Sequence, residues 1–469
     1  MAEENKTPGK TAVETLIHGA TILTLNANRE VLHDGAIAVD GGKIVAVGKS
    51  ADMVPAYAPR HSVDASACIV TPGLVDAHIH ITGDPLTRGV RRGPPGAGFT
   101  DNLMNFVIPL YQAHSAADER LSAQFAALRM LKHGVTSFVE AGTVLHLDEL
   151  VAGLDEVGIR ARVGGWVEGR SFDPAKSETG AIDAAIAILE DQLRRFPPDA
   201  EGRVAVWPLL IGHTVNPDEV WQAAKRIADD HGLGLSAHMS PYGSDPEWFL
   251  ANTGKRPIEH LAELGVLGSN VSLTHVCDVS EREVEILSET GTSVAFCPYS
   301  AIIGAFGVAS RGLYPEMADK GITLTIGTDG NSVDLLSSAN LMAGLLRDAR
   351  RDETLFPATQ MLEMLTRNGA RAMGLEHRLG AVEVGHYADL ALYENRHTHW
   401  SSCFDVADQV INAGGGVQAH SVWVQGQRVI ENYKATMIDE DAVYARLQAA
   451  GASIVTRSGV PVHQPWPVR

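Results

Sequence analysis

The chain has 469 residues, with 57 acidic against 38 basic side chains and a net charge of −19. That charge would repel a phosphate backbone and an anionic lipid surface alike, so we expect neither a nucleic-acid partner nor a membrane partner. An apolar share of 45% and a charged share of 20% are typical of a globular protein, and the length fits a barrel with one accessory domain.

The chain opens with short alternating strands. Residues 15–70 include "TLIHGATILTL" and "GAIAVDGGKIVAVG", and the "DGGK" at 40–43 predicts a β-hairpin. A similar pattern of short alternating strands occurs in "GHYADLALYE" at 385–394 and "VQAHSVWVQGQRVIEN" at 417–432. We therefore expect residues 1–68 and 376–436 to form one small β-sandwich domain from both chain ends.

Between these segments, apolar strands alternate with amphipathic helices, which is typical of repeated β-α units on a parallel sheet. Eight strands are expected at 68–78, 136–142, 160–169, 203–213, 233–238, 270–275, 292–298 and 321–330. The pattern predicts an α/β fold in which residues 69–375 form a (β/α)8 barrel, or TIM barrel. A helix at 358–373 would pack outside it, and residues 437–469 would hold a terminal helix at 439–450 and a tail.

Polar residues end several of the expected strands. They are His78, His80, His213, His238, His275 and Asp329. One such histidine is more often structural, but the carboxyl ends of barrel strands meet on one face, and the side chains of "HIH" point the same way on an extended chain. Neutral imidazoles and a carboxylate suit Zn²⁺, Fe²⁺ or Co²⁺, so we expect one divalent metal ion, with zinc preferred.

The motifs "PGLVDAHIH", "HGVTSFVEAG", "LSAHMS", "LTHV", "FCPYS" and "IGTDG" occur in this order. With the split β domain, the chain resembles the amidohydrolase superfamily, in the branch with one metal ion that includes cytosine and guanine deaminases and triazine hydrolases. The resemblance implies that His78, His80, His238 and Asp329 are the metal ligands. It also implies that His275 polarises the substrate or orients the attacking water.

Relatives with two metal ions usually supply a carboxylated lysine from the fourth strand. The expected fourth strand, 203–213, has no lysine, and Lys176 and Lys225 fall in a predicted loop and helix. A single ion is therefore the prediction.

The sequence departs from its relatives near the expected fifth strand. The resemblance implies a glutamate two residues after the fifth-strand histidine, and Ser240 holds that place. A hydroxyl cannot replace a carboxylate as an acid or base near neutral pH. Glu247 is one candidate replacement, although a solvated helix residue is the simpler interpretation. Ala301 stands where relatives carry asparagine, so we expect a rebuilt substrate pocket.

Several side chains on the expected strand-end loops are candidates for substrate binding. They are Phe99, Trp166, His213 and Tyr299. Aromatic walls would favour a small, largely apolar molecule.

The predicted function is hydrolysis of a carbon–nitrogen bond in an amide, urea or carbamate by metal-activated water. Asp329 would accept the proton of the water and pass it to the leaving amine, while His275 would stabilise the developing negative charge. The similarity extends to bacterial hydrolases of phenylurea and thiocarbamate herbicides, which implies xenobiotic degradation.

One alternative is a deaminase of an N-heterocycle such as a triazine, purine or pyrimidine. Another is a barrel without activity that serves as a scaffold.

The setting predicted from the sequence is the cytoplasm. Four cysteines are scattered without paired spacing, and the polar first residues lack the apolar core of a signal peptide. By resemblance, the enzyme would be a homo-oligomer.

Overall fold

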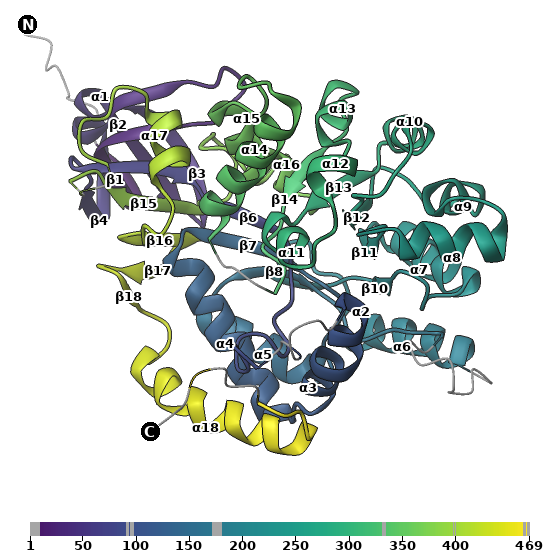
Figure 1. Cartoon of the computed structure of the whole chain (residues 1–469). Coiled ribbons are helices and arrows are strands. Elements are labelled where there is room, and N and C mark those ends of the chain that lie inside the picture. Colours follow the sequence, from purple (N-terminus) through teal and green to yellow (C-terminus); the bar gives the residue numbers. More distant parts are fainter. Residues whose placement is uncertain are drawn as a thin grey trace, which may run out of the picture.

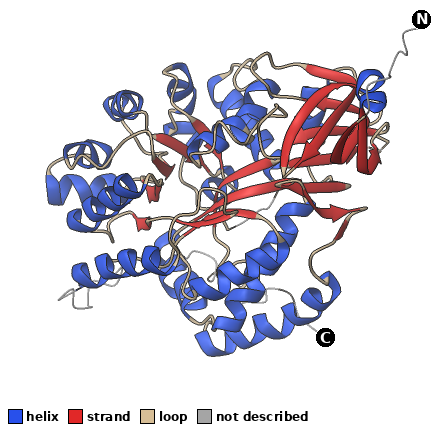
Figure 2. Ribbon diagram, turned by 180° about the vertical axis from the view of Figure 1, so that it is seen from behind, coloured by secondary structure: helices blue, strands red, loops and turns tan. Residues whose placement is uncertain are grey.

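The computed structural model describes residues 10–462 and 466, except 91–92, 94–97, 171–180, 331–333, 397 and 399. A β region built from both chain ends lies beside a larger body of parallel strands and helices (Figure 1). Seen from behind, the strands of the β region fan out at one end of the molecule and helices surround the remaining strands (Figure 2). Within the described part of the chain, no helix is long and apolar enough to span a membrane.

The β region is one sheet in which both chain ends take part. Its order is β18-β17-β16-β15-β5-β1-β2-β3, and β4 also pairs with β1. The strands are β1 (Thr11–Leu23), β2 (Val31–Asp40), β3 (Lys43–Lys49), β4 (Tyr57–Asp64), β5 (Cys68–Pro72), β15 (Leu390–Glu394), β16 (Ser421–Val424), β17 (Gln427–Glu431) and β18 (Lys434–Ala435). Because β5 pairs with both β1 and β15, it joins the two ends of the chain. A sandwich of two separate sheets and the domain boundaries stay predictions.

The hairpin predicted at "DGGK" is confirmed. Asp40 pairs with Lys43, and the two glycines between them have positive φ angles of 55° and 77°. This left-handed backbone is available to glycine at little cost, and it matches the twist of the two strands.

The larger body contains two parallel sheets. One has the order β6-β7-β8-β9 and the other β10-β11-β12-β13-β14. The strands are β6 (Leu74–Ile79), β7 (Val135–Glu140), β8 (Arg160–Val163), β9 (Val204–Val206), β10 (Leu209–Gly212), β11 (Leu235–Met239), β12 (Val271–His275), β13 (Ser293–Phe296) and β14 (Leu324–Ile326). The α/β class with parallel strands is confirmed.

The expected fourth strand is present but divided. It runs as β9 and β10, with Trp207 and Pro208 between them, because proline has no N–H to offer a strand ladder. Since β9 pairs with β8 and β10 pairs with β11, this broken strand links the two sheets along the chain. At the other edges, β6 and β14 share no ladder, although the Asp329 N–H donates to the His78 carbonyl over 2.9 Å.

Helices cover the parallel strands. They are α1 (Ser50–Ala56), α2 (Phe99–Asn102), a π-helical turn (Leu103–Val107), α3 (Ile108–Gln112), α4 (Ala116–Lys132), α5 (Leu147–Val157), α6 (Ala181–Arg195), α7 (Asp218–His231), α8 (Ser244–Thr253), α9 (Pro257–Glu263), α10 (Glu281–Thr290), α11 (Pro298–Ile303), α12 (Val308–Arg311), α13 (Tyr314–Asp319), α14 (Leu335–Arg350), α15 (Ala358–Leu365), α16 (Arg367–Ala372), α17 (Val406–Ala413) and α18 (Glu440–Ser458). The helix expected at 358–373 breaks at Thr366, whose φ of −131° is not helical.

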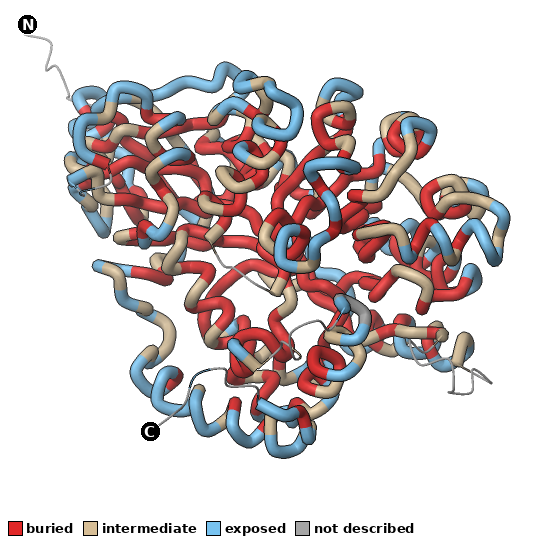
Figure 3. Tube along the Cα trace, in the orientation of Figure 1, coloured by how far each residue is buried: buried red, intermediate tan, exposed pale blue. Residues whose placement is uncertain are grey.

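The buried residues follow the strands and the inner faces of the helices (Figure 3). At the C-terminus, α18 continues beyond the expected 439–450 and packs on the segment that follows the histidine pair. Val443 and Ile454 of α18 share an apolar cluster with Leu86 and Leu110. The last long helix therefore supports the loop that leaves the candidate site.

Candidate metal centre

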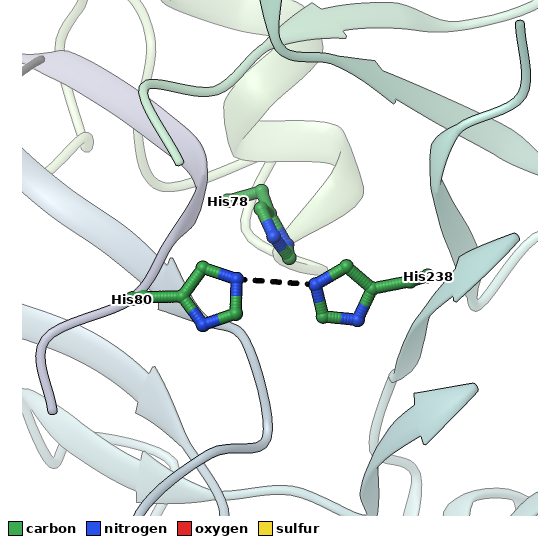
Figure 4. A group of neighbouring side chains, drawn as sticks. All are labelled: His78, His80 and His238. Carbon is green, nitrogen blue, oxygen red and sulfur yellow. Dashed lines mark hydrogen bonds between the residues drawn. The ribbon is translucent and has the colours of Figure 1, made fainter. Parts of the chain in front are cut away.

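Three histidines from two strands converge at the carboxyl ends of the parallel strands. His78 lies in β6, His80 follows that strand directly, and His238 lies in β11. Their rings point toward one another (Figure 4), and the Nε2 atoms of His80 and His238 are 3.2 Å apart. One nitrogen from each ring can be chosen so that all three lie within 4.8 Å of one another.

The opposite ring nitrogen of each histidine is held by hydrogen bonding. His238 Nδ1 lies 2.7 Å from the Ile211 carbonyl oxygen. A carbonyl only accepts, so Nδ1 of His238 carries the hydrogen and Nε2 presents a lone pair to the centre. His78 Nδ1 lies 3.0 Å from the Thr274 hydroxyl, and His80 Nδ1 lies 3.1 Å from the Thr143 hydroxyl.

Asp329 completes the group from the loop after β14. Its Oδ1 lies 3.3 Å from His80 Nε2, and its Oδ2 lies 3.9 Å from His275 Nε2. Burial favours the neutral carboxyl, but the neighbouring imidazoles of His80, His78 and His275 outweigh it and hold the pKa of Asp329 below its ordinary value.

Burial favours the neutral form of three imidazoles at this point, those of His78, His238 and His275. Burial holds the pKa values of His78 and His238 well below the ordinary value and lowers the pKa of His275 to about 4. His78 Nε2 is buried and has no hydrogen-bond partner. A buried polar atom without a partner is costly in a folded protein.

The donors fit a divalent cation. Two nitrogens that each lie about 2.0–2.1 Å from one Zn²⁺ at a tetrahedral angle are about 3.3 Å apart. The distances of 3.2 and 3.3 Å from His80 Nε2 to His238 Nε2 and to Asp329 Oδ1 match this spacing. An ion at this point would also satisfy the orphaned Nε2 of His78.

A second group of possible ligands contains Asp329 but none of the three histidines. His275, Cys297 and Asp329 offer three ligand atoms within 4.8 Å of one another. Burial raises the pKa of the Cys297 thiol well above its ordinary value, and a cysteine binds metal as the thiolate. The histidine group with Asp329 is therefore the better cation site.

The strand ends carry backbone strain. Non-glycine residues with positive φ angles of 50–76° follow or end β10, β11, β12 and β14: His213, Ser240, His275, Val276 and Asp329. Such conformations persist where the surrounding structure enforces them, and they cluster at functional sites.

Two glycines permit the close approach of the strands. A Cβ on Gly212 would lie 2.1 Å from the His238 carbonyl oxygen, and a Cβ on Gly327 would lie 2.7 Å from the His78 carbonyl oxygen. Neither position accommodates a side chain without moving a candidate ligand.

His213 also reaches the centre. Its ring stacks on His238 with centroids 5.2 Å apart, and its Nδ1 lies 2.8 Å from Oδ2 of Asp245. Asp245 is buried and also accepts the Ser240 N–H over 2.9 Å. Glu247 is exposed on the same helix, so the buried carboxylate beside the fifth strand is Asp245, which the sequence interpretation did not consider.

The other predicted substrate contacts are less informative. Tyr299 lies in a surface hollow of about 550 Å³ between α11, α14 and α17. Trp166 is partly buried, and its backbone N–H donates to the Val144 carbonyl. The side chain of Phe99 lies outside what the structure describes. These three stay predictions.

An aromatic wall stands beside the candidate catalytic histidine. Phe306 meets the His275 ring edge to face at 5.4 Å, and Tyr242 lies 5.5 Å from Phe306. Tyr111 lies 5.9 Å from His80 on another side. These rings offer apolar surface close to the polar donors.

Two buried carboxyls behind the centre escaped the sequence interpretation. Asp76 accepts the backbone N–H of His78 and of Thr328, and burial raises its pKa to about 7. Glu140 lies behind Thr143, and burial raises its pKa to about 8. The available signal was an acidic residue inside an apolar strand, in "GLVDAH" and "TSFVEAG".

The amidohydrolase family matches residues 69–429, and a bacterial imidazolonepropionase-like composite domain matches residues 35–58. The first match spans most of the chain. The chain belongs to the amidohydrolase family. The resemblance found in the motifs is thereby confirmed, and the histidine group lies where the motif "DAHIH" of this family member ends.

Curated relatives match the amidohydrolase chain over nearly its whole length. A 5-methylthioadenosine/S-adenosylhomocysteine deaminase from Syntrophobacter fumaroxidans is 27% identical over 95% of this chain and 99% of its own. A 5'-deoxyadenosine deaminase from Methanosarcina acetivorans is 27% identical over the same shares.

Solved structures agree in fold. An adenosine deaminase from Xanthomonas campestris with bound zinc has a TM-score of 0.85 and 26% identity, over 96% of this chain and 100% of its own. An atrazine chlorohydrolase from Arthrobacter aurescens complexed with zinc has a TM-score of 0.81 and 23% identity, over 93% and 99%. The second likeness concerns the fold alone.

Proposed function

We propose that this amidohydrolase uses one divalent metal ion, preferably zinc, to hydrolyse a carbon–nitrogen bond of a small molecule. The proposal rests on the convergence of one ring nitrogen from each of three histidines, with the Asp329 carboxylate 3.3 Å from His80 Nε2. It also rests on His78 Nε2, which is buried at this point without a hydrogen-bond partner. His78, His80, His238 and Asp329 would hold the ion. A bound divalent ion lowers the pKa of a water molecule toward neutrality.

The side chains around this point have separate tasks. Asp329, kept anionic beside the imidazoles, accepts the proton of the attacking water. His275, whose ring lies 5.6 Å from that of His238, donates a hydrogen bond to the oxygen or ring nitrogen on which negative charge develops. His213, oriented by Asp245, receives this proton from Asp329 and passes it to the departing nitrogen.

The first substrate class is the amides, ureas and carbamates. The absence of a glutamate at Ser240 favours these compounds, because their leaving amine is protonated more easily than a ring nitrogen. The rings of Phe306 and Tyr242 favour an apolar group beside His275. Degradation of a xenobiotic would fit this class.

The second substrate class is the N-heterocyclic amines, of which adenosine-type nucleosides are the leading case. The near full-length similarity to deaminases of 5-methylthioadenosine and 5'-deoxyadenosine favours it. In this reaction, His213 and Asp245 would perform the proton transfer that Ser240 cannot.

We further propose that the two parallel sheets form one (β/α)8 barrel. The division of the fourth strand at Pro208 and the hydrogen bond from Asp329 to His78 across the β6–β14 edge support closure. Aromatic contacts from Trp166 and Tyr299, a homo-oligomeric state and a cytoplasmic location also belong to the proposal.

Metal analysis and a substrate panel test the proposal together. The purified protein is expected to hold one equivalent of zinc or another divalent ion, and His238→Ala is expected to lose both the ion and the activity. His260→Ala is the matched control, because His260 pairs with Asp218 on the helices and not with the histidine group.

The panel separates the two substrate classes by product. Release of an amine from ureas, amides or carbamates supports the first class, and release of ammonia from adenosine-type nucleosides supports the second. A protein that binds no divalent ion, or a His238→Ala variant that keeps full activity, would contradict the proposed function.

A further inference from the structure

His80 differs from the other two histidines of the centre in what lies behind its outer nitrogen. The outer nitrogen of His238 contacts a backbone carbonyl, and the outer nitrogen of His78 contacts the Thr274 hydroxyl. Behind His80, the Thr143 hydroxyl continues to a carboxyl, since Thr143 Oγ1 lies 2.8 Å from Oε1 of Glu140. His80 is therefore the one ring of the three that these hydrogen bonds connect to a second ionisable group.

The hydrogens in the hydrogen bonds that link His80, Thr143 and Glu140 can be assigned by counting donors. Oε2 of Glu140 accepts the backbone N–H groups of Gly142 and Thr143 over 2.6 and 3.1 Å. The Thr143 hydroxyl has a single hydrogen. If that hydrogen goes to Oε1 of an anionic Glu140, the hydroxyl oxygen must accept from Nδ1–H of His80, and Nε2 is left with its lone pair. If it goes instead to His80 Nδ1, the ring keeps a hydrogen on Nε2 and cannot bind a cation there.

Strand pairing and burial hold Thr143 and Glu140 in place and away from water. Glu140 is fully buried and Thr143 is 4% exposed. Glu140 ends β7 and pairs with Ile79 of β6, and the Ala141 N–H donates to the Ile79 carbonyl over 3.1 Å. The strand pairing thus fixes Glu140 beside the backbone that carries His80. Burial raises the pKa of Glu140 to about 8, and the positive charge of a cation at His80 Nε2 would oppose that shift and favour the anionic carboxylate.

We propose that Glu140 is a positioning residue that acts through the Thr143 hydroxyl. It holds His80 in the tautomer with hydrogen on Nδ1 and thereby sets the affinity of the centre for a divalent cation. The inference rests on the proposed function, because it assigns a role toward the ion that His80 would hold. Partners behind metal-binding histidines generally act in this way.

The test is the equilibrium affinity for Zn²⁺ alone, measured on metal-free protein by competition with a chromophoric chelator. Glu140→Gln is decisive for a geometric reason. With its oxygen on the two backbone N–H groups, the amide must turn its NH₂ toward Thr143, which then donates to His80 Nδ1. Glu140→Gln and Thr143→Val are each expected to weaken zinc binding roughly 10- to 100-fold. Thr143→Ser keeps the hydroxyl and is expected to bind zinc as the unchanged protein does.

Double variants distinguish an effect of Glu140 that passes through Thr143 from an unspecific loss of zinc affinity. Glu140→Gln combined with Thr143→Val is expected to bind zinc no more weakly than Thr143→Val alone, because both changes break one path. Glu140→Gln combined with Thr274→Val is expected to show the product of the two single effects, because Thr274 serves His78. Circular dichroism of each metal-free variant checks that the fold is kept.

Two results would overturn the inference, and they differ in what else they affect. Wild-type affinity in Glu140→Gln, or additive effects of Glu140→Gln and Thr143→Val, would remove the role of Glu140 and leave the proposed function standing. Absence of zinc binding in the unchanged protein would remove the proposed function and the inference together.

Discussion

At the residue scale, the choice of carboxylate beside the fifth strand decides how a proton reaches the leaving nitrogen. Ser240 has a buried hydroxyl with no hydrogen-bond partner, and Glu247 is exposed. Asp245 instead holds Nδ1 of His213 at 2.8 Å. In the proposed reaction, the acid for proton transfer is therefore the His213 imidazole, oriented by Asp245.

Asp245→Asn is expected to lower kcat about 10²-fold, within the usual contribution of general acid–base catalysis, and to leave the zinc content unchanged. The amide oxygen can still accept the Ser240 N–H, so the local backbone is kept. Steady-state kinetics and metal analysis provide the measurement. The loss is expected to shrink for nitroanilides, because their electron-poor nitrogen depends less on general-acid catalysis as it leaves. A purely structural role would not produce this dependence.

Glu247→Gln, on the same helix, is the control and is expected to keep full activity. If Asp245→Asn lost the same factor in kcat for strongly and weakly basic leaving amines, the pair of His213 and Asp245 would have no role in proton transfer.

The candidate ligands could be predicted from the sequence because each stands at a strand end, where the fold itself brings distant residues together. Their hydrogen-bond partners could not. The hydroxyls that hold His80 and His78 come from positions 63 and 196 residues away along the chain. Only the strand register and the loop conformation decide which threonine meets which ring.

At the element scale, α18 lies so close to the loop after His80 that one of its positions, Gly451, has no room for a side chain. A Cβ on Gly451 would lie 2.3 Å from the Leu86 carbonyl oxygen, whereas a Cβ on Gly344 in α14 would meet nothing within 4 Å. The two helical glycines therefore form a natural pair for comparison.

Gly451→Ala is expected to destabilise the fold by roughly 1–3 kcal/mol, because the clash displaces backbone in a packed interface. Gly344→Ala is expected to stabilise it by roughly 0.5–1 kcal/mol, since alanine is the better helix former and has room. Urea unfolding followed by circular dichroism compares the two. Stabilisation by both substitutions would show that α18 does not press on the loop.

Elements with strong local signals could be predicted from the sequence. The "DGGK" hairpin appears as expected, and α7 ends at Gly232 with a φ of 64°. The break at Pro208 was missed because an apolar run continues through it. The break at Thr366 was missed because apolar residues at helical spacing occur on both sides of it, and the packing of neighbouring elements decides where the hydrogen bonding stops.

At the scale of the whole molecule, one buried ion pair connects the parallel strands to the β region. Arg160 in β8 donates from Nε and Nη2 to Asp389, just before β15, over 3.1 and 3.3 Å. Both side chains are almost fully buried, and the Arg160 guanidinium also lies over the Tyr387 ring.

Arg160→Met is expected to lower the free energy of unfolding by about 3–5 kcal/mol, because it leaves the Asp389 carboxylate buried without its cation. Arg203→Met is the control. Arg203 pairs over 3.7 Å with Asp155, whose side chain is exposed, and a surface pair contributes about 0–1 kcal/mol. Urea denaturation of both variants measures the difference, and equal effects would contradict a special role for the Arg160 pair.

The place where β6 and β14 meet without a ladder has a consequence for biosynthesis. His78 and His80 lie on the β6 side and Asp329 on the β14 side, and Asp329 comes 249 positions after His80 in the order of translation. A nascent polypeptide therefore displays two of the donors long before the last one leaves the ribosome. Cation capture by the complete set is consequently a late event, which follows the assembly of the surrounding strands and gives no help in starting it.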